Sequence, residues 1–251
     1  MLFRSGPVGP VPAPPAGTPP AWYNPLTRAQ SYGQQTQQVR AQVALHPRLR
    51  PLLWIDEWNL DAGYDARHDG PYDAALTAAV LDSLQQAGLD RSCFFRVADD
   101  ARGTLGNWGL LFSDFRAKPA YQAFRFWHEA AGASLPVTLP PGEEGADPGG
   151  RVGAVASSRG GATSVLVYNV VPYDPTGNDG AVDPTPYDHA VALSLSGLAP
   201  GRYTLTRQLV DGSHGGEVVE RRSSRVGRDG RLTVPFTLAG DGVSLLRLEP
   251  R

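Results

Sequence analysis

Two adjacent carboxylates, Asp56 and Glu57, end a short apolar run within the segment PLLWIDEWNL, residues 51–60. A tryptophan stands on each side of the pair, and Asn59 follows the second one. The chain has only seven glutamates, and Glu57 is the first of them. A carboxylate at the end of a strand can act as a nucleophile or as a general acid or base. It can also be an ordinary charge that pairs with an arginine, and position alone leaves both roles open.

A short buried strand over Leu52–Asp56 would position this pair, with Trp54 in the core. Because side chains alternate along a strand, Asp56 and Glu57 should face opposite ways, and only one can point into a barrel. A second apolar run, Ser92–Ala98 (SCFFRVA), predicts a strand that is buried on both faces. Cys93 lies inside this run and is expected to be a small buried side chain.

Three predicted helices flank these strands. The first covers the polar, Gln-rich segment Leu26–Leu45, which contains no proline. The second begins after Gly70-Pro71, carries apolar residues at helical spacing and ends at Gly88. The third covers Pro119–Ala131. The order helix, strand, helix, strand, helix is typical of a parallel sheet that is covered by helices.

The pattern changes in the second half of the chain. After a Pro/Gly-rich acidic linker come short β-type runs with Gly-rich turns between them: Val152–Ala156, Ser164–Val171, Ala190–Leu195, Arg202–Leu209, Arg231–Leu238 and Val243–Leu248. We therefore predict a disordered, Pro-rich leader over residues 1–21, an α/β part over 22–134, the linker over 135–150 and an all-β sandwich over 151–251. Two strands cannot close a barrel or shield the edges of a parallel sheet. The α/β part must therefore pack tightly on the sandwich, or the chain must be the end of a longer polypeptide.

Composition argues against several classes of function. The formal net charge is -2, which does not suggest a nucleic-acid partner or an anionic membrane surface. No apolar run approaches the roughly 20 residues that span a bilayer. The five histidines lack metal-ligand spacing and one cysteine cannot form a Cys-rich zinc site, so we expect no metal and no cofactor. Localisation and oligomeric state are left open.

Several segments, taken in their order along the chain, resemble the carboxy-terminal half of glycoside hydrolase family 39. These segments are WIDEWN, SCFFRVADD and GNWGLLFSDFRAKPAYQAF, followed by the small β-sandwich. The family contains β-xylosidases and α-L-iduronidases and belongs to a clan of retaining (β/α)8-barrel glycosidases. The resemblance covers roughly residues 22–131 and implies that residues 22–134 are the last strands and helices of a TIM barrel.

The resemblance also implies roles for individual residues. Glu57 matches the nucleophile at the end of the seventh barrel strand, and Trp58 and Asn59 would shape the substrate pocket behind it. Tyr23 matches the end of the sixth strand, where such enzymes often place an aromatic residue that faces the ligand. Trp108 would line the site from the loop after the last strand, because an indole face suits the apolar face of a sugar ring.

One feature of the family is missing. Its acid/base glutamate lies in an Asn-Glu pair on the fourth strand, and this sequence contains no Asn-Glu pair. We therefore expect a fragment of a retaining, β-xylosidase-like glycoside hydrolase that binds carbohydrate, carries the nucleophile and is inactive alone. A non-catalytic carbohydrate- or protein-binding module is the alternative. A further possibility is that another polypeptide supplies the missing strands.

Overall fold

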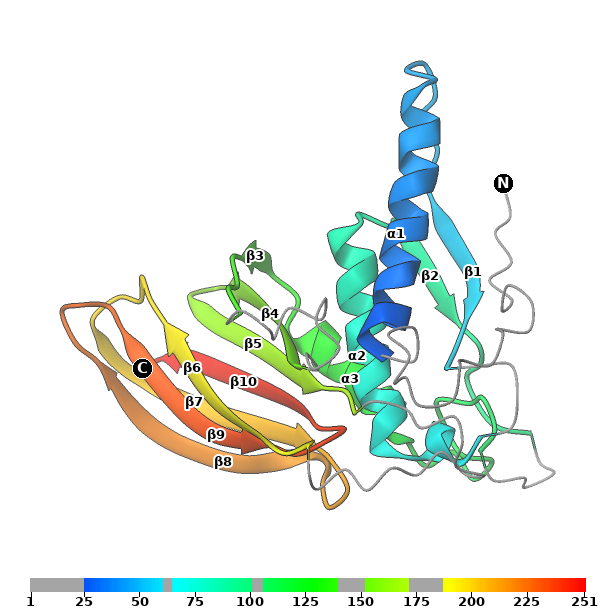
Figure 1. Cartoon of the computed structure of the whole chain (residues 1–251). Coiled ribbons are helices and arrows are strands. Elements are labelled where there is room, and N and C mark those ends of the chain that lie inside the picture. The colour runs from blue at the N-terminus through cyan, green and yellow to red at the C-terminus, as the bar shows by residue number, and fades with distance from the viewer. Residues whose placement is uncertain (1–24, 61–64, 101–105, 140–151, 172–186) are drawn as a thin grey trace, which may run out of the picture.

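The computed structural model describes residues 25–60, 65–100, 106–139, 152–171 and 187–251. Figure 1 shows the helices and the parallel strand pair on one side of the molecule, and the antiparallel strands on the other. The leader predicted over residues 1–21 and the candidate Tyr23 lie outside these ranges, as do residues 140–150 of the predicted linker.

The α-helices of the described residues begin and end close to the predicted positions. α1 spans Pro25–Ala44, α2 spans Pro71–Gln86 and α3 spans Pro119–Glu129, and a short 3-10 helix, η2, spans Ala66–Asp69. Both α2 and α3 start with a proline, whose missing N–H would be unpaired in the first turn anyway. Gly88, just after α2, has a φ of 70°, a conformation that glycine adopts without strain.

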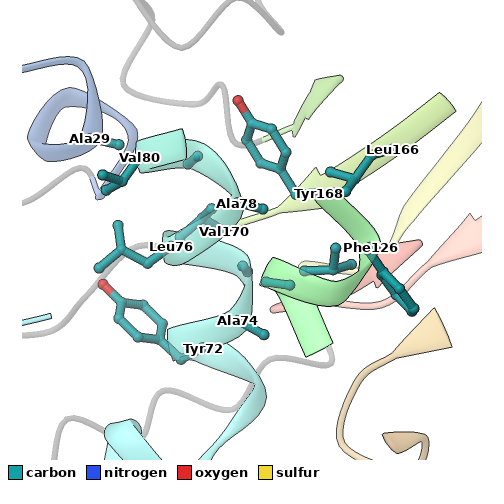
Figure 2. Packing of buried hydrophobic residues seen from close by; sticks show 14 of the residues in the cluster. Ala29, Tyr72, Ala74, Leu76, Ala78, Val80, Phe126, Leu166, Tyr168 and Val170 are labelled. Atoms are coloured by element: carbon teal, nitrogen blue, oxygen red, sulfur yellow. The ribbon is translucent and has the colours of Figure 1, made fainter. Parts of the chain in front are cut away.

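Helix α2 lies at the centre of the α/β part and is buried from Tyr72 to Val80. α1 and α3 both pack against it. Figure 2 shows α2 with Ala29 of α1 on one side and with Phe126 of α3 and the sheet residues on the other. The alanines in the middle of α2 leave room for these neighbours to approach closely, so the helix is buried on more than one face.

Strands β1 (Trp54–Trp58) and β2 (Arg91–Phe94) pair in parallel, as the order of elements predicts. Ile55 lies opposite Ser92, but the next paired residue of β1, Trp58, lies opposite Phe94. Between these two pairs the chain advances by three residues in β1 but by only two in β2. The extra residue makes a β-bulge at the two carboxylates.

The parallel pair is buried on one face only. Ile55 and Trp58 belong to the core with the helices, but several side chains predicted to be buried are exposed: Trp54 (47%), Val97 (72%), Phe95 and Cys93. The predictions of a second strand buried on both faces, and of Trp54 and Cys93 in the core, are therefore wrong. The physical reason is that burial of a parallel strand on both faces needs further elements, and none covers this face in the described part of the chain.

The antiparallel strands form two sheets. The larger has the order β3-β4-β5-β10-β7-β8, with β3 at Ala133–Leu135, β4 at Val152–Arg159, β5 at Ala162–Asn169, β10 at Val243–Pro250, β7 at Gly201–Val210 and β8 at Gly215–Val226. The smaller pairs β6, His189–Leu195, with β9, Leu232–Leu238. β3 pairs with β4, so this sheet begins before residue 151.

The larger sheet is the middle layer of the molecule, and its central strands β5 and β10 are buried on both faces. Along β5, Val165 and Val167 join the core shared with β6 and β9, whereas Leu166 and Tyr168 join the core shared with the helices. The Tyr168 hydroxyl donates a hydrogen bond to the carboxylate of Asp82 in α2 at 2.7 Å. The α/β part thus packs tightly on the β-sandwich, one of the two arrangements that the sequence left open.

Candidate active site

Asp56 and Glu57 are both exposed at the bulged end of β1. Regular alternation would turn the two side chains to opposite faces, but the bulge interrupts that alternation here. Ile55 and Trp58, three positions apart, are therefore both buried, while the two carboxylates between them reach solvent. β-bulges are common beside active sites, where they redirect a side chain.

Three side chains gather at the corresponding end of β2 and in the following loop. The ring centroids of Phe95 and Trp108 lie 6.2 Å apart, and the Arg96 guanidinium lies 5.9 and 5.8 Å from them. Because β1 and β2 are parallel, this aromatic–arginine cluster lies at the same end of the sheet as Glu57. Aromatic faces beside a guanidinium can stack on a sugar ring and donate hydrogen bonds to its hydroxyls.

Asn59 ties the ends of the two strands together. Its side-chain amide donates hydrogen bonds to the carbonyls of Phe95 and Trp108, the second at 2.9 Å, and its oxygen accepts from the Leu60 N–H at 2.6 Å. These bonds are made to backbone groups. Asn59 therefore holds the aromatic–arginine cluster beside the end of β1.

Trp58 supports the carboxylates from behind. It is only 3% exposed and packs against the rings of Phe94, Phe124 and Tyr32, with centroids 5.1, 6.0 and 6.2 Å away. A side chain this deeply buried has almost no surface to offer a ligand. Its contribution to the site is to fix the position of β1.

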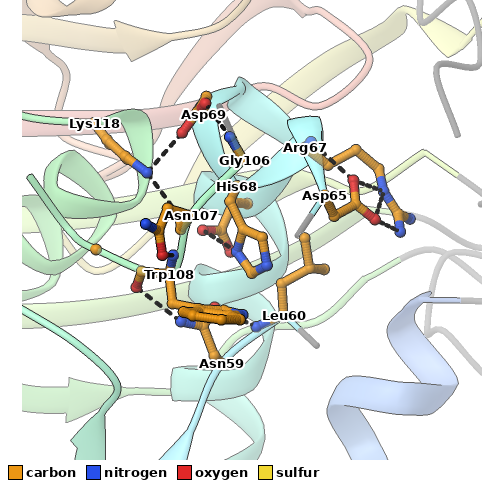
Figure 3. A network of polar contacts seen from close by, with 12 residues as sticks. Asn59, Leu60, Asp65, Arg67, His68, Asp69, Gly106, Asn107, Trp108 and Lys118 are labelled. Carbon is orange, nitrogen blue, oxygen red and sulfur yellow. Dashed lines mark hydrogen bonds and ion pairs between the residues drawn. The ribbon is translucent and has the colours of Figure 1, made fainter. Parts of the chain in front are cut away.

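Lys118, the sole lysine of the chain, joins three loop segments beneath the site (Figure 3). Its side chain is fully buried at the start of α3. The Nζ atom lies 2.6 Å from Asp69 Oδ1 and 2.9 Å from Asp99 Oδ2, and it donates to the Asn107 carbonyl at 2.7 Å. A buried ammonium group is costly unless it is paired and hydrogen-bonded, and here both conditions are met.

The loop that carries Trp108 is held by several side chains. Asp99 accepts a hydrogen bond from the Gly109 N–H at 2.8 Å and so caps the loop. Asn107 Oδ1 accepts from the Trp108 N–H at 3.0 Å and from Arg96 at 3.2 Å. The partly exposed indole of Trp108 thus has a defined position relative to β2.

Hydrogen bonds and an ion pair also hold the segment after β1 in place. The Asp65 carboxylate caps η2 by accepting from the Arg67 N–H at 2.9 Å, and it also pairs with the Arg67 guanidinium. Burial raises the pKa of Asp65, but the hydrogen bonds and charge of Arg67 outweigh burial and hold that pKa below its ordinary value. Farther along, the Gly106 N–H donates to Asp69 at 2.6 Å and so links this segment to the Trp108 loop.

The structure thus brings Glu57, Asn59 and Trp108 to one end of the parallel pair and places Trp58 behind them. Sequence reasoning missed Arg96, Asn107 and Lys118. For Lys118 a signal exists, because a sole lysine directly before a helix-starting proline stands out among 23 basic residues. Arg96 and Asn107 carry no such signal, since their roles depend on contacts across loops.

Within the described residues, no group of three or more histidine, cysteine, aspartate or glutamate side chains is placed to hold a metal ion. In the same part of the chain, no helix combines the length and the apolar character needed to cross a membrane.

Comparison with known proteins gives matches at the level of structure. No protein-family model and no curated protein sequence matches this chain. The GH39 enzyme from Xanthomonas axonopodis pv. citri matches with a TM-score of 0.71 at 19% identity, over 88% of this chain and 49% of that one. A monomeric β-xylosidase from Caulobacter crescentus CB15 matches with a TM-score of 0.68 at 17% identity, over 86% and 49%.

The chain has the fold of the carboxy-terminal part of family 39 glycoside hydrolases. A glucosidase from Croceicoccus marinus is similar as well, with a TM-score of 0.67 at 20% identity over 89% of this chain and 51% of that one. This chain therefore spans about half the length of the solved structures that it matches. The family resemblance seen in the sequence is confirmed for the fold.

Proposed function

We propose that this chain is the carboxy-terminal part of a retaining glycoside hydrolase of the β-xylosidase type, with Glu57 as the nucleophile. On this proposal, β1, β2 and the three helices are the last elements of a (β/α)8 barrel, and the β-sandwich follows them. The observation that carries the proposal is the exposed Glu57 at the bulged end of a parallel strand, in a fold shared with family 39 enzymes. Barrel enzymes place their reactive groups at this end of the strands.

Glu57 would attack the anomeric carbon of a glycoside and form a covalent glycosyl-enzyme. A second carboxyl group, about 5–5.5 Å away, would protonate the departing oxygen and then activate the water that releases the sugar. Asp69 and Asp99 are poor candidates for this second role, because both pair with the buried Lys118. With no Asn-Glu pair in the sequence, we propose that the chain alone does not hydrolyse glycosides.

The proposed ligand is a carbohydrate, bound against the aromatic–arginine cluster. Trp108 and Phe95 would stack on the sugar, and Arg96 would donate hydrogen bonds to its hydroxyls. Asn59 would act indirectly, because its side chain holds the carbonyls of Phe95 and Trp108. Tyr23 keeps its proposed role as an aromatic residue that faces the ligand.

A 2-fluoro-xyloside with a good leaving group tests the nucleophile, because it traps the glycosyl-enzyme. The test uses a form of the protein with a complete barrel, as a longer chain or as a complex, and peptide mass spectrometry locates the label. We expect the label on Glu57, its loss in Glu57→Gln and its retention in the matched neighbour variant Asp56→Asn. A label on any other residue would contradict the assignment.

A carbohydrate-binding module without chemistry is the second candidate function. The aromatic–arginine cluster favours it, because stacking on a sugar needs no acid/base. Calorimetry with xylo-oligosaccharides distinguishes the binding module from the enzyme. Binding that survives Glu57→Gln, together with no turnover by any form of the protein, would support the binding module over the enzyme.

A further inference from the structure

Several arginines lie on one face of the larger sheet, beyond the part that α3 covers. The registers of β8, β7 and β10 arrange the side chains of this face in three rows. The rows are Arg221, Thr206 and Arg247; Ser223, Thr204 and Glu249; and Arg225, Arg202 and Arg251. We call these residues the arginine face. Figure 1 shows this end of the sheet, near the carboxy terminus, on the opposite side of the molecule from β1 and β2.

Two contacts establish that these side chains share a face. At one end, Gln208 of β7 accepts a hydrogen bond from Arg125 of α3 at 2.8 Å, so the helix covers the face there. At the other end, the Arg251 side chain donates to the Thr204 hydroxyl at 2.9 Å. Alternate residues of β7, from Gln208 through Thr204 to Arg202, therefore point the same way. Beyond Gln208 the face reaches solvent, since every arginine in it is exposed or half-buried.

Protection of the sheet edge does not account for the arginine face. β8 is an edge strand, where charged side chains hinder unwanted pairing. Arg202 and Arg247, however, belong to β7 and β10, which have a paired strand on each side. Arg202 also lies directly opposite Arg225, and like charges directly opposite each other destabilise a strand pair. A bound anion would offset this repulsion.

The arginine face contains little negative charge of its own. Arg247 pairs with Glu249 at 3.1 Å. Arg202, Arg221 and Arg225 form no ion pair with any other described residue. Their guanidinium groups are therefore available to an anion in solution, and each carries several hydrogen-bond donors.

We propose that the arginine face binds an acidic polysaccharide, a glycan chain with carboxylate groups on successive sugars. Arg221 and Arg225 are separated by about 14 Å along an extended strand, so one small anion cannot contact both. A guanidinium group binds a carboxylate through two parallel hydrogen bonds. The serine and threonine hydroxyls between the arginines can donate to and accept from sugar hydroxyls. The proposal concerns a site on the sandwich and does not depend on the role of Glu57.

Two other kinds of polyanion fit the arginine face less well. Single-stranded nucleic acid binds to aromatic side chains on which its bases stack, and the arginine face contains no aromatic residue. The formal net charge of -2 also disfavours nucleic acid. The centre of a protein interface is mainly apolar, whereas every residue of the arginine face is polar or charged.

Isothermal titration calorimetry of the full 251-residue chain tests the proposal. The probe is oligogalacturonate, which carries a carboxylate on every sugar, and its methyl ester is the matched neutral ligand. We expect the acid form to bind, its affinity to fall as salt is added, and the ester to bind at least tenfold more weakly. Glu57→Gln should leave the affinity unchanged, which separates this site from the proposed active site.

Two arginines of β8 provide a matched pair of variants. Arg225 belongs to the arginine face, whereas Arg222 is on the opposite face of the strand and pairs with Glu220 at 2.7 Å. Arg225→Gln should weaken binding at least tenfold, and Arg222→Gln should leave it unchanged. Arg225→Gln also removes the repulsion from Arg202, so its urea midpoint should be no lower than that of the parent. Lost binding would then not result from unfolding.

Several results would overturn the proposal. These are equal losses of affinity in the two arginine variants, equal affinity for the acid and its ester, or no binding of oligogalacturonate. Tighter binding of poly-glutamate or of single-stranded DNA than of oligogalacturonate would also overturn it, because the arginine face would then belong to a protein or a nucleic-acid interface.

Discussion

At the scale of single residues, the loops around Glu57 depend on buried charges more than on the candidate nucleophile itself. Lys118 balances Asp69 and Asp99 and also holds the Asn107 carbonyl, so one side chain joins the loops after both parallel strands. Removing one partner of such a network leaves uncompensated charge in the interior, which costs more than the network contributes when intact.

Replacing Lys118 with methionine tests this role. Because Asp69 and Asp99 would lose their buried counter-charge, we expect the free energy of unfolding to fall by about 3–5 kcal/mol. Urea unfolding at neutral pH measures it. The control is Arg116→Met, whose ion pair with Asp114 is exposed and should contribute almost nothing. Equal effects of the two changes would refute the structural role of Lys118.

Asp241 predicts a pH dependence of stability. Burial raises the pKa of its carboxyl to about 6, although the Val171 N–H and the charge of Arg67 act in the opposite direction. A raised pKa in the folded state means that the folded protein binds the proton more tightly than the unfolded chain. Stability is therefore greatest at low pH in this window and is lost as pH rises from about 4 through 6.

Asp241→Asn should remove this loss. Asparagine tolerates the positive φ of 59° at this position, and its oxygen can still accept from Val171. We expect the variant to be more stable than the parent by about 2–3 kcal/mol at pH 7.5 and equal to it at pH 3.5. Urea unfolding at the two pH values measures the difference. If the variant and the parent differ in stability by the same amount at both pH values, the Asp241 carboxyl does not titrate in this window.

At the scale of elements, helix α2 and strand β5 join the two halves of the molecule. The Tyr168 hydroxyl donates to Asp82, which also accepts from Gln86 at 2.8 Å. Burial raises the pKa of Asp82, and these two hydrogen bonds partly oppose the effect. Burial and the neighbouring Asp82 carboxylate also raise the pKa of Tyr168. The Tyr168 hydroxyl therefore stays protonated and remains a donor.

Tyr168→Phe isolates this contact between helix and sheet. It leaves a buried carboxylate with one donor fewer, so we expect the free energy of unfolding to fall by about 1–3 kcal/mol. Tyr203→Phe is the matched control, because that hydroxyl donates only to the Ala199 carbonyl at a partly buried position. Chemical denaturation of both variants checks that Tyr168→Phe loses more stability than Tyr203→Phe. A larger loss in Tyr203→Phe would contradict the importance of the Asp82 contact.

At the scale of the whole molecule, one core contains residues from both halves. Leu166 and Leu245 of the larger sheet pack in the same cluster as Leu76 and Phe126 of the helices. Neither half can unfold without exposing apolar surface of the other. We therefore expect the α/β part and the β-sandwich to unfold together.

The distribution of tryptophan allows a direct test of this cooperativity. All five tryptophans lie at or before position 127, so their fluorescence reports on the amino-terminal half alone. Far-ultraviolet circular dichroism reports on the whole chain, including the sandwich. The two thermal transitions should coincide within a degree or two, because coincident probes are the mark of a two-state transition. A fluorescence transition at a temperature well below that of the circular dichroism transition would show that the halves unfold independently.

The limits of sequence reasoning appear in particular elements. β8, the longest strand in the described part of the chain, was not predicted, because Arg221, Arg222 and Arg225 give it no apolar alternation. It lies at the edge of the larger sheet, where charged residues on a strand prevent unwanted pairing. β3 is too short to give a pattern. The bulge in β1 was also missed, because it depends on the register with β2.

The sequence by itself determined where the helices begin and end, that β1 and β2 are parallel, and which known fold the chain resembles. Proline and glycine set those boundaries through local backbone geometry, which needs no distant partner. Only the tertiary structure decided that both carboxylates are exposed, that Trp58 is buried and that Lys118 joins the loops. These features depend on which residues meet across the fold, because burial and pairing are properties of neighbours in space.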